Sequence, residues 1–190
     1  MLFRSVIILA AFIESALMFG AFAFVGADLH LRFGLNFTLV GLFVGTFAIG
    51  GLIYSLSVSY LVGRLGQIGL ATGGGLVLAL AYGALALDLY WWLTPAAVTA
   101  IGFGFYMLHN TLQTNATQMT PQARGTAVAI FSSALYLGQT AGVSAAALVF
   151  DRYTAVPVFL AAGVLLLVLA LWFAHRLRVS RQPEQNIGQG

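Results

Sequence analysis

The stretch from Tyr90 to Thr117 reads YWWLTPAAVTAIGFGFYMLHNTLQTNAT, which is apolar at first and then carries a row of polar side chains. Tyr106, His109, Asn110 and Gln113 recur at the spacing i, i+3, i+4 and i+7, which places them on one face of a helix. Polar groups that face hydrocarbon cost several kcal/mol. The stretch therefore predicts a membrane-spanning helix whose polar face points at another helix or at a water-filled cavity.

The remainder of the chain contains further segments of the same kind. A spanning helix needs about 20 apolar residues, because each residue rises 1.5 Å through a hydrocarbon core roughly 30 Å thick. Six segments meet this requirement: residues 4–27, 38–62, 68–87, 90–117, 125–150 and 155–175. The sequence predicts an all-α membrane protein, with a six-helix bundle over residues 1–176 and a cytoplasmic tail over residues 177–190.

The composition excludes several classes of protein. Of the 190 residues, 61% are hydrophobic and only 7% are charged, against roughly 25% charged residues in a soluble domain. Eight arginines spread singly along the chain and a net charge of +3 argue against nucleic-acid binding. The chain has no cysteine, no lysine and no H-E-x-x-H motif. We therefore expect no metal site, no cofactor and no enzymatic activity.

The arginines predict the orientation of the bundle. Taking alternate loops, one side holds six arginines and the other holds only Arg32 and Arg152. Cytoplasmic loops carry the excess of positive charge. Both termini are therefore expected in the cytoplasm.

Polar residues divide the spans into two kinds. Spans 68–87 and 155–175 carry no ionisable group between their ends and are expected to face lipid, whereas spans 4–27, with Glu14, and 90–117 are expected inside the bundle. The pattern repeats after three spans, which is typical of the 3+3 inverted repeats of secondary transporters. Small-x-x-x-small patterns predict close helix packing at Gly41 and Gly45 and at Gly138 and Gly142.

Two loops carry a resemblance to a known family. Pro121, Arg124 and Gly125 lie in the stretch Gly104 to Ala127, which is similar to the P-x-x-R-G-x-A segment of efflux proteins of the major facilitator superfamily. Arg64 and Gly66 match that family's loop signature G-x-x-x-D-R-x-G-R-R, while Gly63 replaces its acidic residue. The whole chain resembles the C-terminal six-helix half of a drug or sugar efflux transporter, the type that includes arabinose efflux permeases.

The resemblance implies a role in transport. In this family the first and fourth helices of each half line the substrate cavity, and the two halves rock about the bound substrate. The implied function is proton-coupled efflux of a small organic solute across a bacterial inner membrane. The implied partners are the lipid bilayer, the small-molecule substrate, and either an N-terminal six-helix half that this chain lacks or a second copy of the chain.

Glu14 and His109 are the candidate proton-coupling residues. A carboxyl group near the middle of a bilayer must be protonated, paired or hydrated, and a proton-coupled carrier cycles between such states. Histidine titrates near neutral pH and is able to exchange protons with a carboxyl on a facing helix. The alternative is structural: a protonated Glu14 bonded to a neighbouring helix, with His109, Asn110 and Gln113 in hydrogen-bonding roles. Arg64 and Arg124 have two alternative roles: their positive charge sets the membrane topology, or they take part in a cytoplasmic gate with the other half.

Proteins of other classes also have about six membrane spans. An intramembrane serine protease would need Ser144 and His175 in contact, but roughly 20 Å of bilayer separates them in the predicted topology. A non-transporting membrane scaffold or interaction subunit remains an alternative, as does a non-functional fragment of a transporter.

Overall fold

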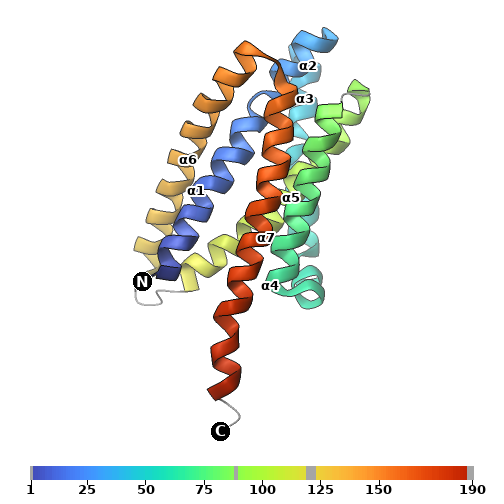
Figure 1. Ribbon diagram of the computed structural model, residues 1–190. Coiled ribbons are helices and arrows are strands. Elements are labelled where there is room, and N and C mark those ends of the chain that lie inside the picture. Colours follow the sequence, from blue (N-terminus) through green and yellow to red (C-terminus); the bar gives the residue numbers. More distant parts are fainter. Residues whose placement is uncertain (1, 88–89, 119–122, 188–190) are drawn as a thin grey trace.

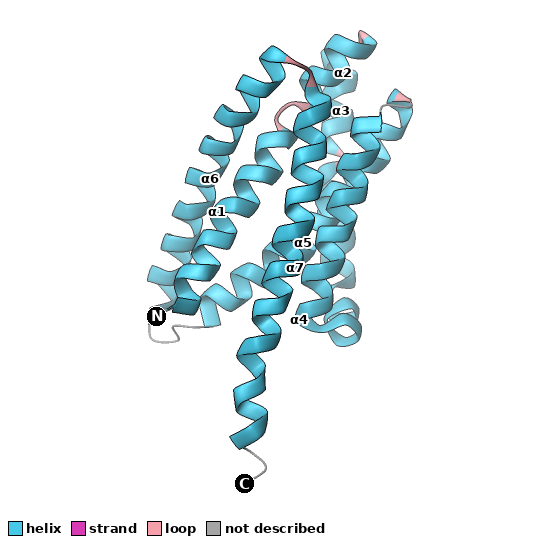
Figure 2. Ribbon diagram, in the orientation of Figure 1, coloured by secondary structure: helices cyan, strands magenta, loops and turns pink. Residues whose placement is uncertain are grey.

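The computed structural model describes residues 2–87, 90–118 and 123–187, and the regular elements within these ranges are all helices (Figure 2). In chain order they are α1 (Leu2–Phe22), α2 (Val25–Phe33), α3 (Phe37–Gly45), α4 (Phe47–Leu87), the 3-10 helix η1 (Trp91–Leu93), α5 (Thr94–Gln118), α6 (Arg124–Arg152) and α7 (Ala155–Ile187).

Helix α4 contains a chain reversal at Gly66. This residue has φ 60° and ψ −177°, which lies outside the helical region and is tolerated essentially only by glycine. Gly50 and Gly74, on either side of it, both approach the backbone of α5 between Thr99 and Leu108. A straight helix would separate these two glycines by about 36 Å, whereas that part of α5 is only about 14 Å long. The chain therefore turns back at Gly66, as Figure 1 shows.

This reversal decides how the membrane crossings are counted. Within the described residues, five helical stretches are long and apolar enough to cross a membrane, and one of them, Phe37–Leu87, has 51 residues. Because this stretch folds back on itself at Gly66, each of its two arms is of bilayer length, so six segments of the described chain have the length and composition of a membrane crossing.

The segment boundaries differ from the prediction in several places. Predicted span 4–27 is interrupted at residues 23–24, between α1 and α2, and predicted span 38–62 is interrupted at Thr46, between α3 and α4. The predicted polar turn over residues 28–37 is mostly helical, because α2 continues to Phe33 and α3 begins at Phe37. Gly34 ends α2 in the left-handed conformation, and the Asn36 side chain accepts a hydrogen bond from the Leu39 amide at the start of α3. The predicted tail over 177–190 is also helical as far as Ile187.

Both termini and the Gly66 reversal lie at the same end of the bundle (Figure 1). We call this the terminal end, and the opposite end, with α2 and the turn between α6 and α7, the far end. Arg64 precedes the Gly66 reversal by two residues, and Arg176 and Arg178 lie in the second half of α7, which leads to the terminal end. Arg32 in the last turn of α2 and Arg152 in the last turn of α6 belong to the far end. The structure thus groups the arginines as the alternating loops predict.

One close helix contact occurs twice, which gives residue-level support to the inverted repeat. A side chain on Gly50 would collide with the backbone of Thr99 and Phe103 in α5, and one on Gly138 would collide with Phe12 and Ser15 in α1. A shift of 88 positions in the sequence moves Gly50 onto Gly138 and Ser15 onto Phe103. The second span thus meets the fourth as the fifth meets the first.

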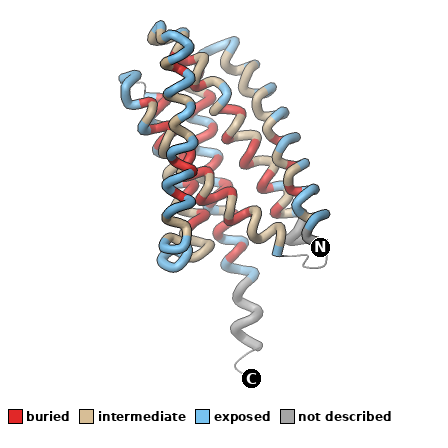
Figure 3. The backbone as a smooth tube through the Cα atoms, turned by 180° about the vertical axis from the view of Figure 1, so that it is seen from behind, coloured by how far each residue is buried: buried red, intermediate tan, exposed pale blue. Residues whose placement is uncertain are grey.

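The expectation that spans 68–87 and 155–175 face lipid all round is wrong. These two spans pack against each other, and a side chain on Gly75 would collide with Ala170. Tyr82 is fully buried and its hydroxyl donates a hydrogen bond of 2.7 Å to the Met18 carbonyl of α1. Buried residues lie mainly where the helices face one another (Figure 3). Helix α6 differs from the others, because only 11% of the residues in its most apolar segment are buried.

The packing role predicted for Gly41 and Gly45 is also not found within this chain. A side chain at either position would meet nothing within 4 Å. Both glycines lie on an open surface groove with Thr38, Thr46 and Ile49. Gly142, by contrast, lies against the backbone of Ala16 in α1, as Gly138 lies against Phe12.

Replacing Gly66 with alanine is expected to destabilise the bundle by about 1–3 kcal/mol, because a β-carbon strains this backbone conformation. The measurement is thermal unfolding of the chain in detergent. Gly63→Ala is the matched control, since Gly63 is helical and open space surrounds it. Equal unfolding temperatures for the two variants would contradict the assignment of the reversal to Gly66.

Candidate functional site

Glu14 and His109 meet in the interior of the bundle. The Nδ1 atom of His109, on α5, lies 2.9 Å from Oε2 of Glu14, on α1. This is the distance of a charge-assisted hydrogen bond. It joins the first and fourth spans, the two that the sequence predicts as interior.

Aromatic rings and a backbone contact fix the two partners in place. The ring of Phe105 stacks on His109 with centroids 4.8 Å apart, and Phe131 of α6 lies 5.4 Å away. Next to Glu14, the buried Ser15 hydroxyl donates a hydrogen bond to the Leu135 carbonyl of α6. The Glu14–His109 pair therefore lies where α1, α5 and α6 come together.

The two partners differ in exposure. The side chain of Glu14 has no exposed surface, and its Oε1 atom has no hydrogen-bond partner. The side chain of His109 keeps 11% of its surface exposed. Because Nδ1 faces Glu14, Nε2 is the ring nitrogen left to exchange protons with the surface. The expected water-accessible face therefore excludes Glu14, which is sealed behind His109.

The other residues of the predicted stripe form a half-buried wall. Tyr106, Asn110 and Gln113 are each partly exposed on α5. The ring of Tyr106 lies 6.3 Å from that of Tyr54 and 6.1 Å from that of Phe47, both on α4. Phe47 in turn lies 5.0 Å from Phe22 of α1. We call this surface the half-buried wall. It consists of the aromatic rings of Phe22, Phe47, Tyr54 and Tyr106, which come from three helices, and of the Asn110 and Gln113 carboxamides of α5.

The candidate loop residues lie away from the pair, toward the terminal end. Arg64 is exposed, with its guanidinium 5.3 Å from the centre of the Tyr60 ring. Gly66 forms the reversal, and the neighbouring Gln67 accepts a hydrogen bond of 3.3 Å from Asn115 of α5. Arg124 and Gly125 begin α6, and Pro121 lies outside the described residues.

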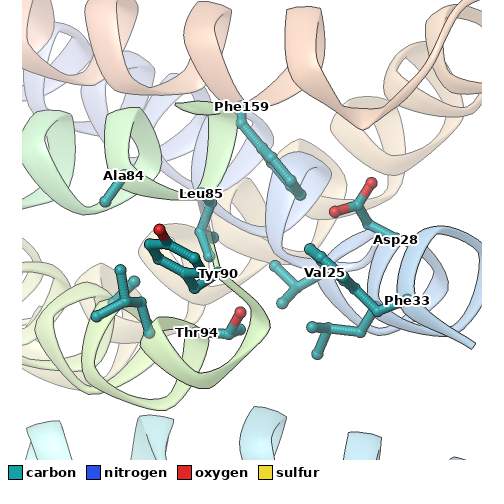
Figure 4. Close-up of a pocket in the computed structure, with 11 residues that line it drawn as sticks. Val25, Asp28, Phe33, Ala84, Leu85, Tyr90, Thr94 and Phe159 are labelled. Atoms are coloured by element: carbon teal, nitrogen blue, oxygen red, sulfur yellow. The ribbon is translucent and has the colours of Figure 1, made fainter. Parts of the chain in front are cut away.

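A small cavity lies at the far end (Figure 4). Its volume is about 20 Å³, and Asp28, Tyr90 and Thr94 are among its lining residues. Asp28 forms an ion pair of 2.9 Å with Arg32, one helical turn further along α2. A space of this size holds a single water molecule, so the cavity is too small to be a solute site. No group of three metal-ligating side chains occurs among the residues that the structure describes.

Several residues of the site were missed in the sequence. Phe105 precedes His109 by four positions, a spacing that brings helical side chains together, so this contact was predictable. Ser15 was marked only by its position next to Glu14. Phe131 carries no local signal, because its role depends on how α6 docks onto α5.

Comparison with known proteins supports the fold. The family model for the Major Facilitator Superfamily matches residues 6–189. The chain is 26% identical over 147 residues to the uncharacterized MFS-type transporter YceJ of Bacillus subtilis (strain 168), covering 77% of this chain and 38% of that protein. It is similar in fold to a bacterial homologue of the iron transporter ferroportin, crystallised in the inward-facing state, with a TM-score of 0.71 and 23% identity over 88% of this chain and 45% of that one. The chain thus spans less than half the length of either protein.

Removing one partner of the Glu14–His109 pair is expected to be more harmful than removing both. His109→Leu leaves a buried carboxyl without a hydrogen-bond partner, which destabilises by about 3–5 kcal/mol. The double variant Glu14→Leu/His109→Leu is expected to recover most of this loss, since no polar group is then left unpaired.

Unfolding in detergent, followed by circular dichroism, measures these differences. His175→Leu is the matched control, because this histidine is exposed on α7 and should tolerate the change. A double variant as unstable as the sum of the two single variants would contradict an energetic pairing of Glu14 with His109.

Proposed function

We propose that this chain, which belongs to the Major Facilitator Superfamily, forms half of a transporter that exports a small organic solute in exchange for protons. It is an integral membrane protein, and all its described helices are consistent with this family's fold. The observation that carries the proposal is the 2.9 Å contact between Glu14 and His109, which joins the first and fourth spans.

Protonation of this pair changes how strongly it holds the two helices. When both ring nitrogens of His109 are protonated, the histidine is a cation that attracts the ionised Glu14. A further proton, bound by the carboxylate, neutralises Glu14, so the charge-charge attraction between α1 and α5 is lost. Intramembrane ionisable residues of this kind mark proton pathways. Proton binding would therefore loosen the contact that holds the two spans together.

The half-buried wall supports an organic solute. Binding sites for small molecules are lined mostly by apolar and aromatic groups, with a few polar groups that fix orientation. Tyr106, Phe47 and Phe22 supply the rings, and Asn110 and Gln113 supply the carboxamides. We place the solute against this wall, with the carboxyl of Glu14 separated from it by His109.

Exposed polar side chains support a second six-helix half. On α6, Ser133, Tyr136, Thr140 and Ser144 are exposed, although a bilayer would surround this helix in isolation. The open groove at Gly41 and Gly45 gives α3 and α4 a similar unpartnered face. We propose that an N-terminal-type half, or a second copy of the chain, covers both faces and closes the solute cavity between the halves.

The distribution of arginines supports the orientation. Because the terminal end carries most of them, we place that end in the cytoplasm of a bacterial cell, with the chain in the inner membrane. In this orientation Arg64, next to the Gly66 reversal, and Arg124, the first residue of α6, lie on the cytoplasmic side, where we place a gate between the two halves. A non-transporting scaffold remains the second candidate, and the same exposed faces would then bind a protein partner permanently.

The proposal predicts that Glu14→Gln abolishes proton-driven export. Cells that express the chain are compared with cells that express the variant, and accumulation of a panel of labelled organic compounds is measured. Cells with the unmodified chain should accumulate less of at least one compound, and an uncoupler should remove the difference. The variant should behave like cells without the protein, because glutamine binds no proton.

Two controls separate coupling from folding. Glu14→Asp keeps the carboxyl and should retain part of the export, while Asp151→Asn alters an exposed acid at the far end and should retain all of it. Full activity of Glu14→Gln with unchanged pH dependence would overturn the coupling role. Equal accumulation of every compound with and without the chain would favour the scaffold.

A further inference from the structure

The half-buried wall beside the Glu14–His109 pair presents no ionised group. Its partly exposed members among the described residues are the rings of Phe22, Phe47 and Tyr106 and the carboxamides of Asn110 and Gln113. The carboxyl of Glu14 is sealed behind His109 and already paired with it. A charged group placed against this wall would lose its hydration without gaining a counter-charge, which is strongly unfavourable.

The position of the Tyr106 ring is specified by the glycine beneath it. A β-carbon on Gly51 would lie 2.5 Å from Cε2 of Tyr106, so the ring occupies the space that any other residue would fill. Tyr54 lies nearly parallel to this ring, at an interplanar angle of 18°. The ring is therefore seated against α4 on one side while Tyr106 stays partly exposed.

The two carboxamides are available for hydrogen bonds. Among the described residues, neither the Asn110 nor the Gln113 side chain has a hydrogen-bond partner within the chain, and both are half-buried. Each carboxamide offers one acceptor and two donor hydrogens. They follow Tyr106 by four and seven positions, so they continue the same face of α5 beyond the ring.

From these three observations we infer that the part of the solute that contacts this half is an uncharged, planar ring bearing a hydrogen-bonding group. The ring packs against Tyr106 and Phe47, and its polar group bonds to Asn110 or Gln113. Gly51 acts as a positioning residue, because it sets the location of the Tyr106 ring without touching the solute. This inference rests on the proposed function, since it takes the wall to be part of the solute site.

Four probes with matched shapes test the inference, with unsubstituted naphthalene as a reference. They are 2-naphthamide, which is neutral; 2-naphthoate, which is anionic; 2-naphthyltrimethylammonium, which is cationic; and the saturated decalin-2-carboxamide. Binding of each to the full chain in lipid nanodiscs is measured by saturation-transfer NMR, and empty nanodiscs correct for partition into lipid. Tyr106→Ala removes the ring, Gly51→Ala displaces it, and Tyr153→Ala removes an exposed tyrosine at the far end as the matched control.

The expected result is a Kd for 2-naphthamide below those of the other three probes. Tyr106→Ala should raise that Kd roughly five- to tenfold, as expected for the loss of an aromatic contact. Gly51→Ala should raise it similarly although every polar group of the wall is retained, and Tyr153→Ala should leave it unchanged. Asn110→Ala combined with Gln113→Ala should reduce the preference for the amide over unsubstituted naphthalene.

Tighter binding of either charged probe than of 2-naphthamide would overturn the inference. The same holds if none of the probes binds, or if Tyr106→Ala and Tyr153→Ala change the Kd equally. Infrared difference spectra between acid and neutral pH, recorded on the same nanodiscs, keep the proposed function separate. A carboxyl band that Glu14→Gln removes would leave proton coupling standing even where the substrate class fails. If 2-naphthamide shows no preferential binding and Glu14→Gln removes no carboxyl band, both the proposed substrate class and the proposed proton coupling are contradicted.

Discussion

A carboxyl group in the hydrocarbon interior needs a partner, and the position of Glu14 makes this the constraint on which the site depends. Glu14 has no exposed surface, so its compensation has to come from within the bundle. His109 supplies it from the fourth span at 2.9 Å. Phe105 and Phe131 pack against the imidazole ring, and the Ser15 hydroxyl donates a hydrogen bond to the Leu135 carbonyl of α6. The buried acid thus joins α1 to α5 at the point where α6 also packs against α1.

Such a contact forms only where helix backbones come close, and glycine makes this possible at two related positions. Gly138 lets α6 approach α1 beside Glu14, and Gly50 lets α4 approach α5 in the equivalent arrangement. Small residues at helix contacts are the usual means of close packing in membranes, where the hydrophobic effect does not drive helices together. The repeated contact places the Glu14–His109 pair between the two three-helix units. A change in the charge of this pair therefore changes the strength of the contact between the two three-helix units.

Much of this arrangement was predictable from residue patterns, and the remainder depended on docking. Bilayer-length apolar runs gave the order of the spans, and the i, i+3, i+4, i+7 spacing put Tyr106, His109, Asn110 and Gln113 on one face. The sequence could not place Glu14 relative to that face, because rotation of α1 about its axis is set by packing against α6. The glycine pattern was ambiguous for the same reason: Gly138 and Gly142 meet α1, whereas Gly41 and Gly45 meet open space. Local polarity likewise failed for span 68–87, whose buried face consists of glycine, alanine and leucine residues and Tyr82 and carries no ionised group.

A water-accessible wall next to a buried acid is tested most directly by cysteine labelling, because the chain has no native cysteine. Single cysteines are introduced at Tyr106, Gln113 and Glu14, and at Leu165 as a lipid-facing control, and the chain in membranes is treated with an impermeant thiol reagent. Rapid labelling is expected at positions 106 and 113, and slow labelling at positions 14 and 165. Labelling at position 14 as fast as at position 113, or none at positions 106 and 113, would contradict this arrangement.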